Sequence, residues 1–215
     1  MIAVDDLRVV FGRTVALDAI DVELGPGIVG LFGPNASGKS TFLRVVAGLL
    51  APARGDIRVA GVVPRASDES FRRQIGYVGH LSGLYEWLTV EENLHLFAQL
   101  YGAAAERVVH GIDSLQLGLF AAAPVGSLSA GTKRRVAVAR ALLHEPRVLL
   151  LDEPYANLDD DAAELVSAAV TAWRAPDRIA VIATHGAKRV RAFADSGIVL
   201  QRGRLARHTE GFRQS

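Results

Sequence analysis

Nine consecutive residues, 33–41, combine glycines with a lysine and hydroxyl side chains, a composition suited to holding phosphate groups. Glycines let backbone N–H groups wrap around phosphate oxygens, and a helix beginning near Lys39 adds the positive potential of its N-terminus. In this pattern the lysine reaches the β- and γ-phosphates and the hydroxyl of Ser40 is a ligand of Mg²⁺. A Gly-rich turn that only joins a strand to a helix is the alternative. We predict a nucleoside triphosphate site formed by Gly33, Pro34, Asn35, Ala36, Ser37, Gly38, Lys39, Ser40 and Thr41.

Two adjacent carboxylates, Asp152 and Glu153, follow the apolar run 148–151. Ligands of parallel α/β sheets bind beyond the carboxyl ends of the strands, which is where this run would deliver both side chains. Asp152 is expected to bind Mg²⁺ through water, and Glu153 to act as the general base that orients and deprotonates the attacking water. Such a pair can also cap a helix dipole, but the phosphate-binding loop upstream favours catalysis.

A second candidate phosphate site begins at Ser129, which has the side chain of a helix N-cap. Alone, this residue indicates only the start of a helix. Together with the phosphate-binding loop upstream and the Asp-Glu pair downstream, segment 128–135 resembles the signature loop of the ATP-binding cassette family, which reads Leu-Ser-Gly-Gly-Gln at this place. The resemblance covers essentially the whole chain.

The resemblance implies that two cassettes face each other head to tail and enclose two ATP molecules. Each ATP would be held by the phosphate-binding loop of one subunit and by the signature loop of the other, so that Ser129 and Gly131 act on the partner's nucleotide. Ala130 and Thr132 depart from the family pattern, which has Gly and Gln there. Ala130 is harmless at negative φ and costs about 1 kcal/mol in a left-handed conformation.

The family pattern assigns further roles by position. Phe11 matches the aromatic residue that stacks on adenine, although a strand Phe can equally belong to the core. Asp159, in segment 157–159, matches the residue that couples the two sites across the dimer. His185 matches the residue that contacts the γ-phosphate and holds the attacking water. His80 stands where the family usually has a Gln that touches Mg²⁺, so that contact is expected to differ here and to depend on pH.

Segments 79–94 and 128–137 also resemble the ATPase subunits of cytochrome c maturation haem exporters. ABC-2-type exporter cassettes for other substrates share most of this pattern, so the cargo stays open. The resemblance implies an ATPase that dimerises on MgATP, most simply as a homodimer, and powers export through separate polytopic membrane subunits. A soluble cassette acting on nucleic acid or ribosomes is the rival, and a regulatory cassette without hydrolysis is a third possibility. The intact Glu153 and His185 argue against the third.

Periodicity predicts the elements that position these residues. Alternating segments indicate an antiparallel strand pair at 3–11 and 15–24, and apolar runs indicate strands at 28–32, 57–63, 74–79, 147–151, 178–183 and 197–201. Helical spacing is found at 39–48, 90–101, 104–117, 129–143, 160–173 and from residue 186. We therefore predict an α/β fold of the P-loop NTPase, ABC nucleotide-binding type: a mixed sheet core, an N-terminal antiparallel β subdomain and a helical subdomain. Residues 1–215 are expected to form one ABC ATPase domain, with the helical subdomain at about 82–145.

Composition limits the other classes. The 215 residues include 24 Lys and Arg, 23 Asp and Glu and no Cys, so disulfides and thiolate chemistry are excluded and a basic nucleic-acid surface is not indicated. The N-terminus does not resemble a secretory signal, and no apolar run reaches the ~18 residues that cross a bilayer. We expect a cytoplasmic protein, peripheral on the inner face of the membrane through partner subunits, with no nucleic acid as partner.

Two surface features add weaker predictions. Tyr85, Trp87 and Leu88 are large apolar residues in an expected loop, which suits either a docking groove for membrane subunits or a satellite hydrophobic cluster. The C-terminal segment is rich in basic residues, which indicates a solvated face or, more weakly, a strip near an anionic leaflet. These residues are Lys188, Arg189, Arg191, Arg202, Arg204, Arg207 and Arg213.

Overall fold

The computed structural model describes residues 1–211, and Arg213 therefore lies outside the described residues. A three-stranded antiparallel sheet has the order β2-β1-β4. Its strands are β1 (Ile2–Phe11), β2 (Thr14–Leu24) and β4 (Arg54–Val59). In β1 the buried residues Ile2 and Val4 alternate with more exposed ones, as a sheet with one covered face requires. This sheet is the antiparallel β subdomain.

A second sheet of six strands has the order β5-β6-β7-β3-β8-β9 and carries the functional loops. Its neighbouring strands run parallel except for β9, which pairs antiparallel with β8. The central strands β3, β6 and β7 are buried along their whole length, in keeping with a parallel sheet covered on both faces. The strands are β3 (Gly27–Phe32), β5 (Ile75–Val78), β6 (Val148–Asp152), β7 (Ile179–Thr184), β8 (Ser196–Gln201) and β9 (Arg204–Glu210).

The six-stranded sheet separates two hydrophobic cores. On one face, residues such as Leu31 and Leu150 pack with α1 (Lys39–Val46) and with the antiparallel sheet. On the other face, Leu149 and Ile182 pack with the remaining long helices. These helices are α3 (Val90–Tyr101), α4 (Glu106–Ser114), α5 (Ala130–Leu142) and α6 (Asp160–Ala172). The short helical elements are α2 (Glu69–Arg72), α7 (Ala187–Arg191) and two 3₁₀ turns, Gly118–Phe120 and Val125–Ser127.

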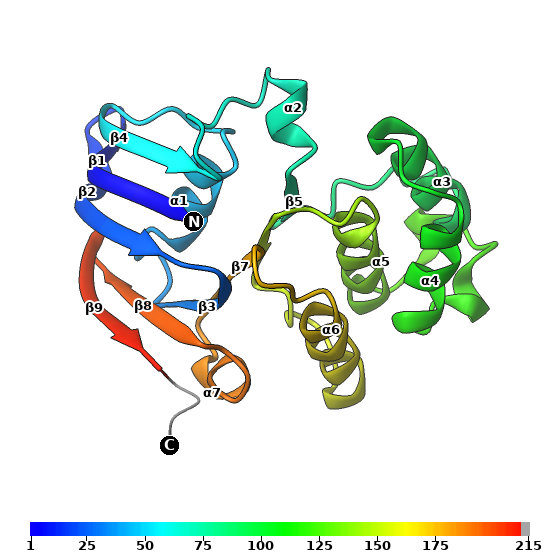
Figure 1. The fold of residues 1–215 in the computed structure, drawn as a ribbon. Helices are drawn as coiled ribbons and strands as arrows, with labels where there is room; N and C mark the ends of the chain where they lie inside the picture. Colours follow the sequence, from blue (N-terminus) through cyan, green and yellow to red (C-terminus); the bar gives the residue numbers. More distant parts are fainter. Residues whose placement is uncertain (212–215) are drawn as a thin grey trace.

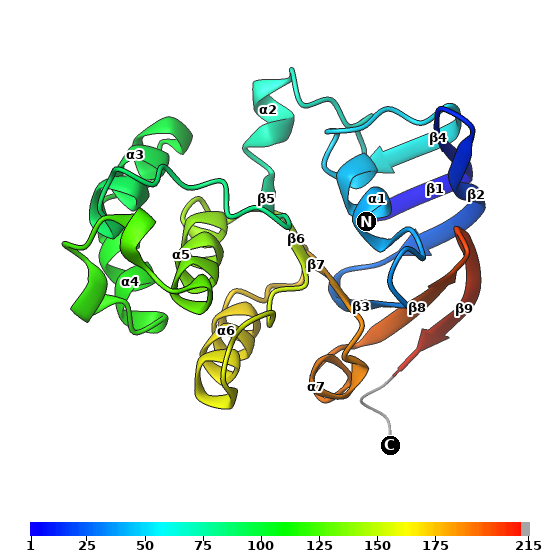
Figure 2. The same cartoon turned by 180° about the vertical axis from the view of Figure 1, so that it is seen from behind.

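Helices α3, α4 and α5 form a group that lies away from the antiparallel sheet, with α6 beside them (Figure 1). The reverse view shows the same separation, with β5, β6 and β7 running between the two parts (Figure 2). The predicted architecture is therefore confirmed: an α/β fold with a mixed sheet, an antiparallel β subdomain and a helical subdomain. Within residues 1–211, no helix has the length and apolar character needed to cross a bilayer.

Two predicted elements differ from the structure, and one strand was not predicted. The strand expected at 57–63 is Arg54–Val59, because Ala60 and Gly61 adopt positive φ (51° and 85°) and turn the chain. The helix expected at 104–117 spans only Glu106–Ser114. Strand β9 was not predicted, because its mostly exposed and charged side chains are those of an edge strand and resemble a solvated tail.

Candidate nucleotide site

The loop between β3 and α1 forms the wall of a cavity of about 670 Å³. Gly33 and Gly38 have φ of 148° and 105°, in the region that L side chains rarely adopt. A Cβ on Gly33 would lie 2.2 Å from the carbonyl oxygen of Leu200, so the loop could not close there with any other residue. The loop lies at the N-terminus of α1, where unpaired backbone N–H groups and the helix dipole favour an anion.

Lys39 is the first residue of α1, and its side chain folds back over the loop. Its Nζ donates to the carbonyl oxygens of Gly33 and Pro34, at 2.8 and 3.0 Å. The side chain is buried and lines the cavity together with Asn35, Ala36, Ser37, Gly38, Ser40 and Thr41. The ammonium group is thus held above the loop, facing the space that a chain of phosphates would occupy.

Among residues 1–211, two oxygen atoms at this cavity are buried without a hydrogen-bond partner. They are Oγ of Ser37 and Oδ1 of Asp152, at the carboxyl end of β6. A buried carboxylate oxygen without a donor is costly unless a cation or water completes its shell. Carboxylate, hydroxyl and phosphate oxygens with water are the ligands that Mg²⁺ takes, and Asp152 and Ser40 both line this cavity. The residues present therefore fit a Mg²⁺ ion bound together with a triphosphate.

Glu153 and His185 meet at the carboxyl ends of β6 and β7. The carboxylate atom Oε1 of Glu153 accepts the backbone N–H of His185 at 3.0 Å and lies 3.0 Å from its ring atom Nδ1. Glu153 has a positive φ of 48°, and its own N–H donates to the carbonyl of Ala183 at 2.8 Å. Both side chains line the cavity. The structure thus brings the predicted base and the predicted switch histidine together beside Lys39.

Phe11, which was predicted to stack on adenine, also lines this cavity. So does His80, which stands where the family usually has a Gln. Phe11 is 46% exposed, so its ring is not part of the core. His80 is exposed. Arg134, on α5, fixes its backbone by donating hydrogen bonds to the carbonyls of Gly79 (2.7 Å) and of His80 (3.4 Å). Burial lowers the pKa of Arg134, while the charges of Asp152 and Glu153 oppose this shift.

The predicted signature residues lie outside this cavity in the same chain. Ser129 caps α5, since its Oγ accepts the N–H of Thr132 at 3.1 Å. Ala130 is the first residue of that helix and is not among the residues with positive φ, so the alanine is tolerated. Thr132 is buried and its hydroxyl lies 3.0 Å from that of Ser129, so its side chain supports the cap and does not face outward.

Gly131 and Asp159 mark a second, separate surface. A Cβ on Gly131 would lie 2.5 Å from the carbonyl oxygen of Asn157, so the start of α5 packs closely on segment 157–159. Asp159 caps α6 by accepting the N–H of Ala162 at 2.8 Å. The side chains of Ser129 and Asp159 are exposed. The structure therefore groups the predicted signature and coupling residues with each other and not with the phosphate-binding loop.

Residues of the hairpin between β8 and β9 also line the cavity, and the sequence did not indicate them. Arg202 and Gly203 form this turn, with φ of 51° and 76°. Gly203 N–H donates to the carbonyl of Ser37 at 3.1 Å, and its own carbonyl accepts the N–H of Asp18 at 2.8 Å. Gly203 is a turn signal that could have located the hairpin, whereas Arg202 is not a residue that favours positive φ. Its position beside the phosphate-binding loop depends on tertiary contacts.

The sequence matches a family model described as ABC transporter over residues 17–156, more than half of the chain. A cytochrome c biogenesis ATP-binding export protein, CcmA, of Cupriavidus necator (strain ATCC 17699 and synonyms) is 39% identical over 192 residues, covering 86% of this chain and 84% of the relative. A Nod factor export ATP-binding protein I of Rhizobium sp. (strain N33) is 34% identical over 199 residues, covering 90% of this chain and 66% of the relative.

Solved structures give the same result at the level of the fold. A dimeric ATP-binding cassette in a post-hydrolysis state, bound to ADP and Pi, has a TM-score of 0.89 and 26% identity over the whole of both chains. The ATP-binding subunit of an ABC transporter has the same TM-score and 28% identity, covering 98% of this chain and 90% of that one. The chain belongs to the ABC transporter family, and its fold is that of the family's ATP-binding cassettes.

Proposed function

We propose that the protein is the MgATP-hydrolysing subunit of an exporter, that it dimerises head to tail on ATP, and that it drives separate membrane subunits. The observation that carries this proposal is the cavity in which Lys39, Asp152, Glu153 and His185 converge at the phosphate-binding loop. These are the groups that a phosphoryl transfer to water needs: a cation for the phosphates, a ligand for Mg²⁺, and a base beside the attacking water.

In this mechanism the loop 33–41 binds the phosphates through its backbone N–H groups, and Lys39 exchanges the carbonyls of Gly33 and Pro34 for phosphate oxygens. Ser40 and Asp152 would hold Mg²⁺, which would supply positive charge to the triphosphate. Glu153 orients water and accepts its proton. His185 fixes the carboxylate of Glu153 and contacts the γ-phosphate when the nucleotide is present. Phe11 supplies an exposed ring for the adenine base.

The second half of each site is proposed to come from another copy of the chain. Ser129, which is exposed, and Gly131, which is half-buried, lie at the N-terminus of α5 and outside the cavity. Backbone N–H groups there can reach a γ-phosphate held by a partner subunit. Asp159 lies on the same surface beside Gly131. The dimeric cassette bound to ADP and Pi supports this arrangement. We take residues 1–215 as one cassette, with the helical subdomain at about 82–145.

The loop before α3 is our candidate contact for membrane subunits. Trp87 is 77% exposed, and its ring centroid lies 5.8 Å from that of Tyr85. The buried side chain of Asn93 holds the loop: Oδ1 accepts the N–H of Tyr85 at 2.8 Å, and Nδ2 donates to the carbonyls of Tyr85, Leu88 and Thr89. A rigid loop that exposes an aromatic side chain suits docking of another protein. The protein would then be cytoplasmic and peripheral on the inner face of the membrane.

For the cargo, we propose haem for cytochrome c biogenesis, because the relative at 39% identity is named a cytochrome c biogenesis ATP-binding export protein. Export of another substrate is the second candidate, since a Nod factor export protein is 34% identical.

The test is affinity purification of tagged Glu153→Gln chain with MgATP from detergent-solubilised membranes of cells that encode it, followed by mass spectrometry. Loss of the base should keep ATP bound and preserve the closed complex. We expect stoichiometric polytopic membrane subunits, and their identity decides between haem and another cargo. Recovery of soluble or ribosomal partners alone would reject the transporter assignment. Wild-type chain without nucleotide is the matched control.

A further inference from the structure

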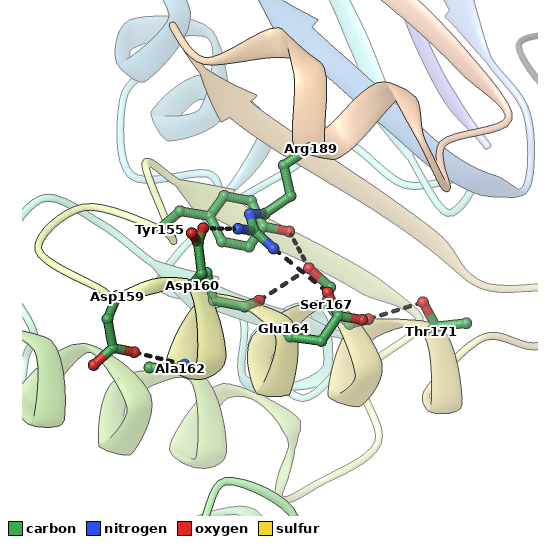
Figure 3. Close-up of polar contacts among 9 residues, drawn as sticks. Tyr155, Asp159, Asp160, Ala162, Glu164, Ser167, Thr171 and Arg189 are labelled. Atoms are coloured by element: carbon green, nitrogen blue, oxygen red, sulfur yellow. Dashed lines mark hydrogen bonds and ion pairs between the residues drawn. The ribbon is translucent and has the colours of Figure 1, made fainter.

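The guanidinium of Arg189 joins two helices beside the proposed catalytic residues. Arg189 lies on α7, four residues after His185. Its Nη2 is 2.6 Å from Oδ1 of Asp160, and its Nη1 is 3.4 Å from Oε2 of Glu164, both on the first turns of α6 (Figure 3). One side chain from α7 therefore holds two carboxylates of α6.

The same guanidinium also lies over an aromatic ring. Its Cζ is 5.9 Å from the ring centroid of Tyr155, and Figure 3 shows the two side chains facing each other between the helices. The hydroxyl of Ser167 is 3.4 Å from that of Tyr155. Burial raises the pKa of Tyr155, so the phenol stays neutral. Arg189 is only 30% exposed, although its partners Asp160 and Glu164 are 99% and 75% exposed, and the Tyr155 ring lies against its guanidinium.

Arg189 and its partner Tyr155 are close in sequence to the two proposed catalytic residues, His185 and Glu153. Tyr155 follows Glu153 by two residues, and Arg189 follows His185 by four. Asp160 is next to Asp159, the N-cap of α6 on the surface shared with Gly131. The proposed mechanism needs fixed relative positions of the segment after Glu153, the segment after His185 and the start of α6. The guanidinium of Arg189 contacts or belongs to all three.

We propose that Arg189 is a positioning residue for ATP hydrolysis: it holds α7 on α6 and on Tyr155, keeps His185 in register with Glu153, and links both to the Asp159 segment. The inference rests on the roles proposed above for Glu153 and His185. Arg189 does not line the cavity, so it acts on turnover and not on ATP binding. Its effect follows from geometry, since small displacements of a base or of its partner lower the rate of the chemical step.

The test compares kcat and KM for ATP in the full-length protein and its Arg189→Ala variant. We expect kcat to fall about fivefold while KM stays within about twofold, because the groups that hold phosphate lie on β3 and α1. Arg189→Lys, which keeps the charge but loses the planar fork over Tyr155, should recover part of kcat. Arg54→Ala is the matched control: Arg54 makes an exposed ion pair of the same length, 2.6 Å, with Asp6 on the antiparallel sheet, and its loss should leave kcat unchanged.

A second variant keeps Arg189 and removes its partners' charges. Asp160→Asn combined with Glu164→Gln should lower kcat to the same extent as Arg189→Ala. Adding Arg189→Ala to this double variant should lower kcat little further. If Arg189→Ala does not fold, the isosteric double variant alone tests the role of Arg189. Unchanged kcat, or a rise in KM equal to the loss in kcat/KM, overturns the inference. The Glu153→Gln variant distinguishes failure of this inference from failure of the proposed function. If Glu153→Gln is active, the proposed function is rejected. If Glu153→Gln is inactive and Arg189→Ala is fully active, only the role of Arg189 is rejected.

Discussion

Glu153 and His185 are in contact through two atoms of the histidine. The backbone N–H and the ring Nδ1 of His185 both lie 3.0 Å from the same carboxylate oxygen, Oε1 of Glu153. Because a carboxylate accepts and does not donate, Nδ1 must carry a proton in this arrangement. The carboxylate is thereby fixed at the end of β7. This contact fixes the orientation of the side chain that we propose as the base.

Replacing Glu153 by Gln is expected to lower kcat at least ~100-fold, because the amide cannot accept the proton of the attacking water. The affinity for MgATP should stay within about threefold, since the loop 33–41 binds the phosphates, and the dimer should accumulate. Phosphate release measures kcat, titration calorimetry measures the affinity for MgATP, and light scattering with MgATP measures the dimer. Glu69→Gln, which changes an exposed carboxylate paired with Arg73, is the control. Undiminished turnover would reject Glu153 as the base.

Removing the ring of Phe11 should weaken ATP binding without changing kcat at saturation. Stacking of a base on an aromatic side chain is worth about 1–3 kcal/mol, which corresponds to roughly a 5- to 150-fold loss of affinity in Phe11→Ala. Phe11→Tyr keeps the ring and should bind normally. Leu119→Ala, at a side chain that is 96% exposed, is the control for loss of a surface apolar group. Titration calorimetry measures the affinity; an unchanged value would show that the ring does not meet the base.

Local signals allowed the sequence to predict the parts of the site that are continuous in the chain. The glycines and Lys39 at the entry to α1 are one example, and the N-cap Ser129 is another. Thr89 and Glu92 form a capping box, with Thr89 accepting the N–H of Glu92 at 3.1 Å, so the start of α3 was predicted at the correct residue. Each signal needs only residues within one turn, which is why the sequence carries it.

The remaining features depend on contacts between distant segments. Gly203 reaches Ser37 and Asp18, more than 160 residues away in the chain, and this contact places Arg202 at the cavity. The C-terminal basic residues were predicted to form a solvated face, with a strip near an anionic leaflet as the alternative. In the structure Arg189 pairs with Asp160 of α6, and Arg204 pairs with Asp18 at 2.6 Å. No periodicity specifies such partners, because they follow from which strands become neighbours in the sheet.

Gly131→Ala is expected to separate ATP binding from dimerisation. The added Cβ would lie 2.5 Å from the carbonyl oxygen of Asn157, a backbone atom, so segment 157–159 must shift. The nucleotide cavity does not include Gly131, and ATP affinity should change by less than about twofold, whereas ATP-driven dimer formation should weaken about tenfold or more. Gly118→Ala is the control, because nothing lies within 4 Å of a Cβ built there. A dimer of normal affinity in Gly131→Ala would remove this surface from the interface.

His144 should make folding stability depend on pH. Its ring stacks on that of Tyr101 at 4.1 Å and lies 3.1 Å from the carbonyl oxygen of Ile75, and burial lowers its pKa to about 4. An unfolded histidine binds a proton near pH 6.5, so between pH 6.5 and about 4 the unfolded chain binds a proton that the folded chain does not, and stability falls as the pH falls. The loss at pH 5 is of order 1–2 kcal/mol, and nothing is lost above about pH 7.5.

His144→Phe keeps a ring against Tyr101 but cannot titrate. Between pH 7.5 and pH 5, urea unfolding should therefore show the free energy of unfolding of the wild type falling by about that amount more than that of His144→Phe. His110→Phe, at an exposed histidine on α4, should instead follow the wild type across the same range. If the wild type and His144→Phe lose stability in parallel, the imidazole either charges without leaving its place or is not buried in solution, and the link between this histidine and folding fails.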